Sequence, residues 1–293
     1  MNESEEVIEM SIWEFIVALL LGLVEGLTEF APVSSTGHMI IVDDILLKSA
    51  ELLKSQEVAN TFKVVIQLGS VLAAAIVFWQ RILSLFGIRT SSSPVPEKGH
   101  SRLRLTHVIA GLIPAVILGF TLEDFIDTYL FSVETVLVGL VGGAILMAVA
   151  DWKARSGSSA KEKTSLDDIS IKQAFLIGLI QCIALWPGFS RSGSTISGGV
   201  LLGLKYRAAA DFTFIMAIPI MFGASAVSLY KKMDVLTVDA IPFFIVGFIS
   251  AFVFAWLSIR FFLALISKIK LMPFAIYRVV LAAVILVIYI NVK

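Results

Sequence analysis

Residues 22–38 read Gly-Leu-Val-Glu-Gly-Leu-Thr-Glu-Phe-Ala-Pro-Val-Ser-Ser-Thr-Gly-His. This stretch is an apolar run that carries two carboxylates and is interrupted by a hydroxyl-rich polar segment, residues 31–37, which we call the first break. Glu25 and Glu29 are four residues apart and therefore share one face of a helix. The apolar segment after the break, residues 38–47, is too short to cross a bilayer, since a spanning helix needs about 20 residues. The stretch therefore predicts a re-entrant helical hairpin with polar groups at its turn.

The composition extends this membrane interpretation to the whole chain. Hydrophobic residues make up 58% of the 293 residues, charged residues only 16%, and the mean hydropathy is +0.92, whereas soluble domains carry about a quarter charged residues. Apolar helical segments are expected near 12–30, 38–47, 62–79, 105–120, 133–150, 173–187, 194–204, 211–230, 240–266 and 273–290. We predict an all-α polytopic membrane protein, a single integral domain over 1–293, with about six spanning helices and two re-entrant hairpins.

A second polar break, residues 187–193, is similar to the first and also precedes a short apolar segment, 194–204. Moving the chain by 156 residues aligns the two breaks without gaps. The aligned pairs include Glu25 with Gln181, Ser34 with Ser190, and Gly37 with Gly193. This duplication predicts an inverted-topology repeat with halves at roughly 12–152 and 173–290, an architecture that places its site where broken helices meet near the midplane.

The basic residues predict the orientation. If the repeat is inverted, fifteen Lys or Arg fall on one side, in the loops 81–104, 153–172, 204–208 and 260–272. Five fall on the other side, in 1–12, 43–60, 121–132, 231–239 and 293. The positive-inside rule places the fifteen in the cytoplasm, so both termini are expected to be extracytoplasmic. The net charge of zero gives no reason to expect a nucleic-acid partner.

The first break carries candidate catalytic groups. Glu25 and Glu29 tolerate each other if a divalent cation lies between them or if one serves as a proton acceptor; solvation near a helix end is the alternative. Hydroxyls before an apolar run are also ordinary N-caps. Free N–H groups at the start of a short helix nevertheless suit a phosphate. Ser35 is therefore a candidate nucleophile, with His38 or Glu29 as its proton acceptor, and the sequence leaves His38 or an activated water open as the attacking group.

The second break adds a cation, Arg191. Its guanidinium could hold phosphate oxygens bidentately and stabilise charge in a transition state. A purely structural ion pair with Glu25 or Glu29 is the alternative. The two roles are compatible, because a ligand could replace the carboxylate. The hydroxyls expected to contact substrate are those of Ser34, Thr36, Ser190, Ser192 and Thr195.

Residues 22–38 resemble the first signature of the undecaprenyl-pyrophosphate phosphatases of the bacitracin-resistance type, and residues 187–195 are similar to the second. The likeness continues through 209–214 and 273–278, so it covers essentially the whole chain. The resemblance implies a multi-pass plasma-membrane enzyme that hydrolyses undecaprenyl pyrophosphate to the monophosphate and inorganic phosphate. Such an enzyme recycles the lipid carrier for peptidoglycan and other cell-wall polymers, supports cell shape, and protects against bacitracin.

The resemblance also implies the site and its partners. Glu25 and Glu29 form an acidic pair for a divalent cation such as Mg2+ or Ca2+, Ser35 and His38 belong to the first loop, and Arg191 binds phosphate. The site is expected to open to the extracytoplasmic side. The expected partners are the polyprenyl pyrophosphate substrate and membrane lipids, and the sequence leaves a homodimer open.

Two other function classes compete with this one. A lipid phosphatase of the phosphatidic-acid type has a similar first loop, but its chemistry needs a histidine after the Ser-Arg pair, and no histidine follows Arg191. A secondary transporter or a flippase for a polyprenyl phosphate shares the inverted repeats and broken helices, and fold alone does not exclude it.

Overall fold

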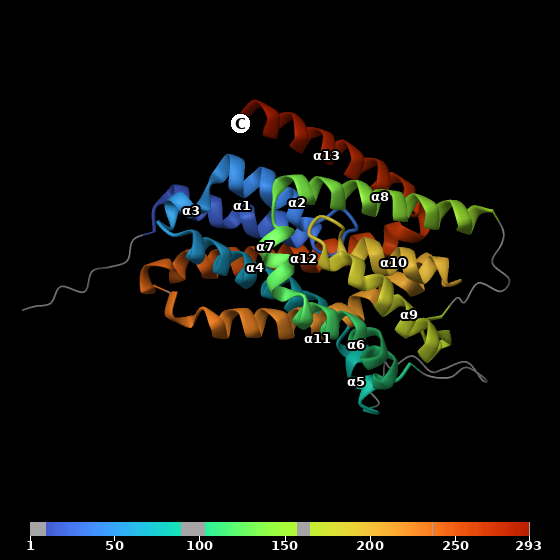
Figure 1. Ribbon diagram of the computed structural model, residues 1–293. Coiled ribbons are helices and arrows are strands. Elements are labelled where there is room, and N and C mark those ends of the chain that lie inside the picture. The colour runs from blue at the N-terminus through green and yellow to red at the C-terminus, as the bar shows by residue number, and fades with distance from the viewer. Residues whose placement is uncertain (1–9, 89–102, 157–164, 236, 293) are drawn as a thin grey trace, which may run out of the picture.

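The computed structural model describes residues 10–88, 103–156, 165–235 and 237–292, and these residues form helices and connecting turns (Figure 1). The first half contains α1 (Ile12–Thr28), α2 (Ser35–Met39), η1 (Ile40–Leu47), α3 (Ser49–Leu52), α4 (Gln56–Val77), α5 (Trp79–Leu85), α6 (Leu105–Thr121), α7 (Glu123–Tyr129) and α8 (Val133–Arg155). The second half contains η2 (Leu166–Asp168), α9 (Ile171–Gln181), η3 (Cys182–Leu185), α10 (Arg191–Leu201), α11 (Tyr206–Lys231), η4 (Met233–Val235), η5 (Val238–Ala240), α12 (Ile241–Ile269) and α13 (Met272–Val292). The predicted all-α class is confirmed.

Long apolar helices with an outward apolar face make this a multi-pass membrane protein. Within the described residues, five helices are long and apolar enough to cross a bilayer: α4, α8, α11, α13, and α12 with the turn before it. The outward side chains Ile245, Ile249 and Leu257 of α12 are about half exposed, as expected for a lipid-facing surface. The segment predicted near 105–120 forms α6, whose 17 residues extend about 26 Å at 1.5 Å per residue.

The orientation in the bilayer stays a prediction. The loops 81–104 and 153–172 and both chain ends lie partly outside the described residues. In Figure 1, α1 begins and α13 ends toward the left of the view, so the described ends lie at one end of the bundle.

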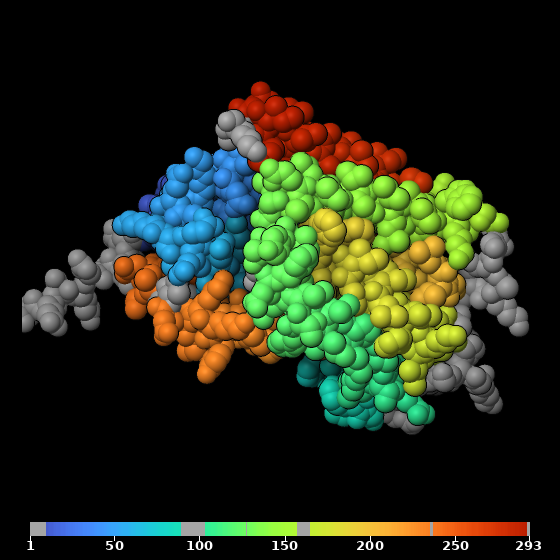
Figure 2. Space-filling model, viewed as in Figure 1, coloured from blue at the N-terminus to red at the C-terminus, as the bar shows by residue number. Residues whose placement is uncertain are grey.

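Close helix contacts are made at glycines. A Cβ atom on Gly22 of α1 would lie 2.7 Å from the Cβ of Ser250 on α12, and nearer still to the carbonyl oxygen of Gly247. Gly178 of α9, which is 156 residues after Gly22, meets the backbone of Gly111 on α6 in the same way. The two halves therefore pack their first helices by the same means. In Figure 2, α13 lies along one edge of α8, which in turn packs on α10.

The two polar breaks end in the same backbone device. Ser34 and Ser190 have positive φ angles of 71° and 68°, and each side chain accepts a hydrogen bond from the backbone N–H three residues later, at Gly37 and Gly193. The helices after them begin at Ser35 and Arg191, three residues earlier than the hydropathy pattern predicts. Positive φ is strained for a residue other than glycine, at a cost of about 1–3 kcal/mol. Its recurrence 156 residues apart agrees with a duplication.

Candidate active site

The two breaks meet, and Glu29 lies at the point of contact. Glu29 follows the last residue of α1. Its Oε2 accepts a hydrogen bond of 2.7 Å from Ser35 Oγ, and its Oε1 accepts one of 3.0 Å from Arg191 Nη2. A second link runs from Ser192 Oγ to the carbonyl oxygen of Ala31, at 3.0 Å. Hydroxyl, carboxylate and guanidinium thus form one contact chain between segments more than 150 residues apart.

Glu25 completes the acidic pair one turn earlier on α1. It is only 5% exposed, and its carboxyl group contacts that of Glu29 and interacts with the charge of Arg191. Its Oε1 is buried without a hydrogen-bond partner in the described part of the chain. Among the described residues, no three or more His, Cys, Asp or Glu side chains lie together in a way that could hold a metal ion. A cation held here would therefore take two carboxylates from the protein and its remaining ligands from elsewhere.

Arg191 is a half-buried cation, and one of its donor nitrogens is left without a partner in the part of the chain that the structure describes. Its side chain is 15% exposed and that of Glu29 is 7% exposed. Nη1 of Arg191 is buried and has no hydrogen-bond partner within the described ranges. The guanidinium also lies over the ring of Phe30, 5.8 Å from its centroid. The structural alternative of an ion pair with Glu29 is thus present, and it leaves part of the guanidinium free for a ligand.

Most of the predicted substrate-binding hydroxyls also form hydrogen bonds within the protein. Ser34 and Ser190 cap their helices, Ser190 Oγ lies 3.2 Å from Ser192 Oγ, and Thr195 Oγ1 donates to the carbonyl oxygen of Arg191 at 2.8 Å. Thr36 is half-buried in the first turn of α2. These residues shape the two helix starts around the contact chain, so the N-cap alternative explains part of the cluster.

His38 lies beside the first break but its ring is engaged elsewhere. Nδ1 is 2.8 Å from the carbonyl oxygen of Ser34, and Nε2 is 2.7 Å from the hydroxyl of Tyr277 on α13. The rings of His38 and Tyr277 are stacked, with centroids 5.6 Å apart. Sequence reasoning did not single out Tyr277, because a tyrosine in an apolar helix carries no charge that would flag it.

The neighbouring residue Arg278 binds the backbone of the second break. It is fully buried, and its guanidinium donates to the carbonyl oxygens of Gly188 (2.7 Å), Phe189 (2.9 Å) and Gly139 (3.2 Å). These bonds join α13 to α8 and to the loop before α10. An arginine inside the apolar run 273–290 predicts interhelical hydrogen bonding, and the structure confirms it.

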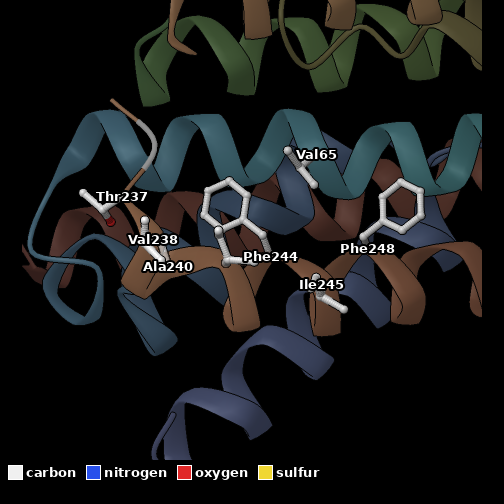
Figure 3. A pocket seen from close by; sticks show the side chains of 8 residues that line it. Val65, Thr237, Val238, Ala240, Phe244, Ile245 and Phe248 are labelled. Atoms are coloured by element: carbon white, nitrogen blue, oxygen red, sulfur yellow. The ribbon is translucent and has the colours of Figure 1, made fainter. Parts of the chain in front are cut away.

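A separate groove of about 330 Å³ lies between α4 and the start of α12 (Figure 3). It is lined by Val65, Thr237, Val238, Ala240, Ile241, Phe244, Ile245 and Phe248. Apart from Thr237 these side chains are apolar, so the groove suits hydrocarbon rather than phosphate. None of the predicted site residues lines it.

Comparison with known proteins points to one family. Residues 18–284 match the family described as bacitracin resistance protein BacA. A protein of Bacillus subtilis (strain 168) named undecaprenyl-diphosphatase is 62% identical over 279 residues, which cover 95% of this chain and 99% of that protein. Proteins of the same name from Anoxybacillus flavithermus (63% over 280 residues, 96% and 99%) and Exiguobacterium sibiricum (60% over 279 residues, 95% and 99%) are similarly related.

Proposed function

Since the chain belongs to the family of the bacitracin resistance protein BacA, we propose that it is an undecaprenyl-diphosphatase whose reaction centre is the contact chain of Ser35, Glu29 and Arg191. It hydrolyses undecaprenyl diphosphate to undecaprenyl phosphate and inorganic phosphate. The reaction returns the lipid carrier to cell-wall polymer synthesis and lowers the amount of diphosphate that bacitracin can sequester, which accounts for resistance.

The observation that carries this proposal is the shared carboxylate of Glu29. A nucleophile and its base need side chains within about 2.6–3.2 Å of each other, and Ser35 Oγ lies 2.7 Å from Glu29 Oε2. Both ring nitrogens of His38 are occupied by Ser34 and Tyr277. Of the two candidate proton acceptors, the geometry therefore favours Glu29.

The reaction follows from these positions. Ser35 Oγ attacks the terminal phosphorus and its proton passes to Glu29, while the bond from that phosphorus to the bridging oxygen breaks. Undecaprenyl phosphate leaves with the bonding electron pair and takes up the proton from Glu29. Water then attacks the phosphorus of the phosphoserine and gives a proton to Glu29, while the bond from phosphorus to Ser35 Oγ breaks. Glu29 returns that proton to Ser35 Oγ, and inorganic phosphate leaves. Arg191 turns from Glu29 toward the phosphate oxygens and stabilises the charge on the transferred group.

The acidic pair fits a divalent cation. Mg2+ in phosphate sites is commonly bound by one or two carboxylates together with substrate phosphates and water, and Glu25 Oε1 is a buried oxygen without a partner in the described chain. We propose that Glu25 and Glu29 hold Mg2+ or Ca2+. When bound, the ion neutralises charge on the diphosphate.

The site is proposed to open to the extracytoplasmic side, and the prenyl chain to remain in the bilayer. The excess of Lys and Arg in the loops assigned to the cytoplasm supports this orientation. A protein with its hydrolytic site on that side acts on the diphosphate left in the outer leaflet.

The test is phosphate release by purified protein in detergent, without any membrane gradient. The wild-type protein should release phosphate from undecaprenyl diphosphate with Mg2+ and lose this activity with EDTA. Ser35→Ala should reduce kcat by about 1,000-fold or more, the scale seen when a covalent nucleophile is removed, and acid quenching should trap phosphate on Ser35 in the wild-type protein only. Ser156→Ala, which changes an exposed serine after α8, is the matched control.

Two results would contradict the proposal. Normal turnover by Ser35→Ala would exclude this serine as the nucleophile and favour an activated water. Absence of phosphate release from the wild-type protein, together with movement of polyprenyl phosphate across vesicle membranes, would identify the protein as a transporter instead.

A further inference from the structure

The ring of His38 is fixed at both nitrogens, and this determines where its proton lies. The carbonyl oxygen of Ser34 only accepts hydrogen bonds. Nδ1 of His38, 2.8 Å from that oxygen, must therefore carry the hydrogen. In the neutral ring Nε2 is then an acceptor, so the hydroxyl of Tyr277, 2.7 Å away, donates to it. The carbonyl oxygen of Ser34 thus fixes the tautomer of the histidine, and the hydroxyl of Tyr277 holds the ring in the orientation in which Nδ1–H reaches that oxygen.

The hydrogen bond from His38 Nδ1–H is made to Ser34, the residue of the first break that has a positive φ angle. Ser34 has a φ of 71°, and its carbonyl oxygen also receives the backbone N–H of His38 at 3.4 Å. The ring N–H is the shorter of the two bonds to this oxygen. Because Ser35 follows directly, the angle at which its Oγ approaches Glu29 depends on the peptide that His38 holds. A misplacement of about 1 Å at a reacting group can cost on the order of 100-fold in rate.

We infer that Tyr277 is a positioning residue of the phosphatase: through the Nδ1–H tautomer of His38 it holds the Ser34–Ser35 peptide, with the Ser35 hydroxyl directed at Glu29. This inference rests on the proposed function. It assigns His38 a bracing role rather than proton transfer, and it gives α13 a part in arranging the first break. Arg278, the next residue of α13, holds the second break, so one turn of one helix supports both loops.

The kinetic test separates bracing from proton transfer. Tyr277→Phe keeps the stacked ring and removes only the hydroxyl. It should lower kcat about 10- to 100-fold and leave KM within about twofold, because the hydroxyl acts on the nucleophile and not on substrate binding. The control is Tyr289→Phe, which lies on α13 like Tyr277 and removes a hydroxyl bonded to Glu134 of α8. It should leave activity within about twofold.

Substitution of His38 gives the sharper result. The amide N–H of an asparagine takes the place of the histidine Nδ1–H, whereas alanine offers no donor. His38→Asn should therefore retain at least about 10-fold more activity than His38→Ala, and Tyr277→Phe should have no further effect when combined with His38→Asn. If His38→Asn is as inactive as His38→Ala, the histidine transfers protons and the inference is wrong. Full activity of Tyr277→Phe would also overturn it.

A measurement independent of turnover keeps this inference distinct from the proposed function. The chain has three histidines, and ¹⁵N NMR of protein labelled at histidine, with His38→Asn for assignment, reports the tautomer directly. The Nδ1–H form should be seen in the wild-type protein and should mix with the Nε2–H form in Tyr277→Phe. An Nε2–H tautomer in the wild type would refute the inference even if the protein hydrolyses diphosphate. If the protein fails to hydrolyse diphosphate but shows the Nδ1–H form, only the proposed function fails.

Discussion

Removing the guanidinium of Arg191 should destabilise the protein far more than neutralising its partner. Arg191→Ala leaves Glu25 and Glu29 in contact, both almost completely buried, with no cation beside them. Loss of one partner of a buried pair costs about 3–5 kcal/mol because the other charge is left uncompensated. Glu29→Gln costs less, about 1–2 kcal/mol, since Glu25 remains to balance Arg191 and the amide oxygen still accepts a hydrogen bond.

The same geometry predicts that a divalent cation restores stability to Arg191→Ala. If Glu25 and Glu29 hold a divalent cation, that ion takes over the role of the guanidinium in Arg191→Ala. Saturating Mg2+ should then stabilise this variant by about 2.7 kcal/mol at a concentration 100 times Kd, and clearly more than it stabilises the wild-type protein. Activity should stay low, because the ion does not replace the guanidinium on the transferred phosphate.

SDS titration of detergent-solubilised protein, followed by tryptophan fluorescence, measures these free energies with and without Mg2+. Arg191→Lys is the matched control: it retains the charge and should lose less stability, although the ammonium lacks the planar fork. Glu25→Gln combined with Arg191→Ala should abolish the extra stabilisation by Mg2+. Equal stability of Arg191→Ala and the wild-type protein without metal would show that Arg191 does not compensate the buried carboxylates. No response to Mg2+ in Arg191→Ala would show that the carboxylates do not form the cation site.

Two further predictions concern packing and topology. Gly22→Ala should destabilise the protein by about 1–3 kcal/mol, because its Cβ meets the backbone of α12. Gly223→Ala, where no atom lies within 4 Å of the added Cβ, should be neutral or stabilising in the same SDS titration; equal effects of the two would contradict the contact. In cells carrying the protein with Cys182→Ala, a membrane-impermeant maleimide should label Ser132→Cys from outside and leave Ser156→Cys unlabelled. The reverse labelling would invert the proposed orientation.

Hydropathy predicted the order of the helices well because each long helix is a continuous apolar run. It placed the starts of the short helices three residues too late, since residues 35–37 are polar or glycine and still form the first helical turn. The capping conformation of Ser34 lies outside what hydropathy reports. It depends on a positive φ that a serine seldom adopts. The ring of His38 binds the Ser34 carbonyl oxygen, and Tyr277, which is distant in the sequence, binds that ring.

The site was partly predictable for a related reason. Glu29 and Arg191 are charges inside apolar segments, which is a strong signal because such charges need a partner or a function. Their meeting could be expected once the duplication placed both breaks near the midplane. Tyr277 gave no such signal. Its hydroxyl acquires a role only through the packing of α13 on the first break, 239 residues away from His38 along the chain.

The predicted duplication would explain why the residues of the proposed site differ between two breaks whose backbones are alike. Positions 156 residues apart share the helix starts and the positive φ angles, but their side chains differ: Ser35 corresponds to Arg191, Glu25 to Gln181, and His38 to Ser194. Two identical copies would bring two carboxylate pairs together, which repel, or two arginines without a base. Instead, the proposed nucleophile and the carboxylates lie in the first half and the cation lies in the second. The contact between Glu29 and Arg191 thus joins the two halves, and neither half holds all the residues of the proposed reaction centre.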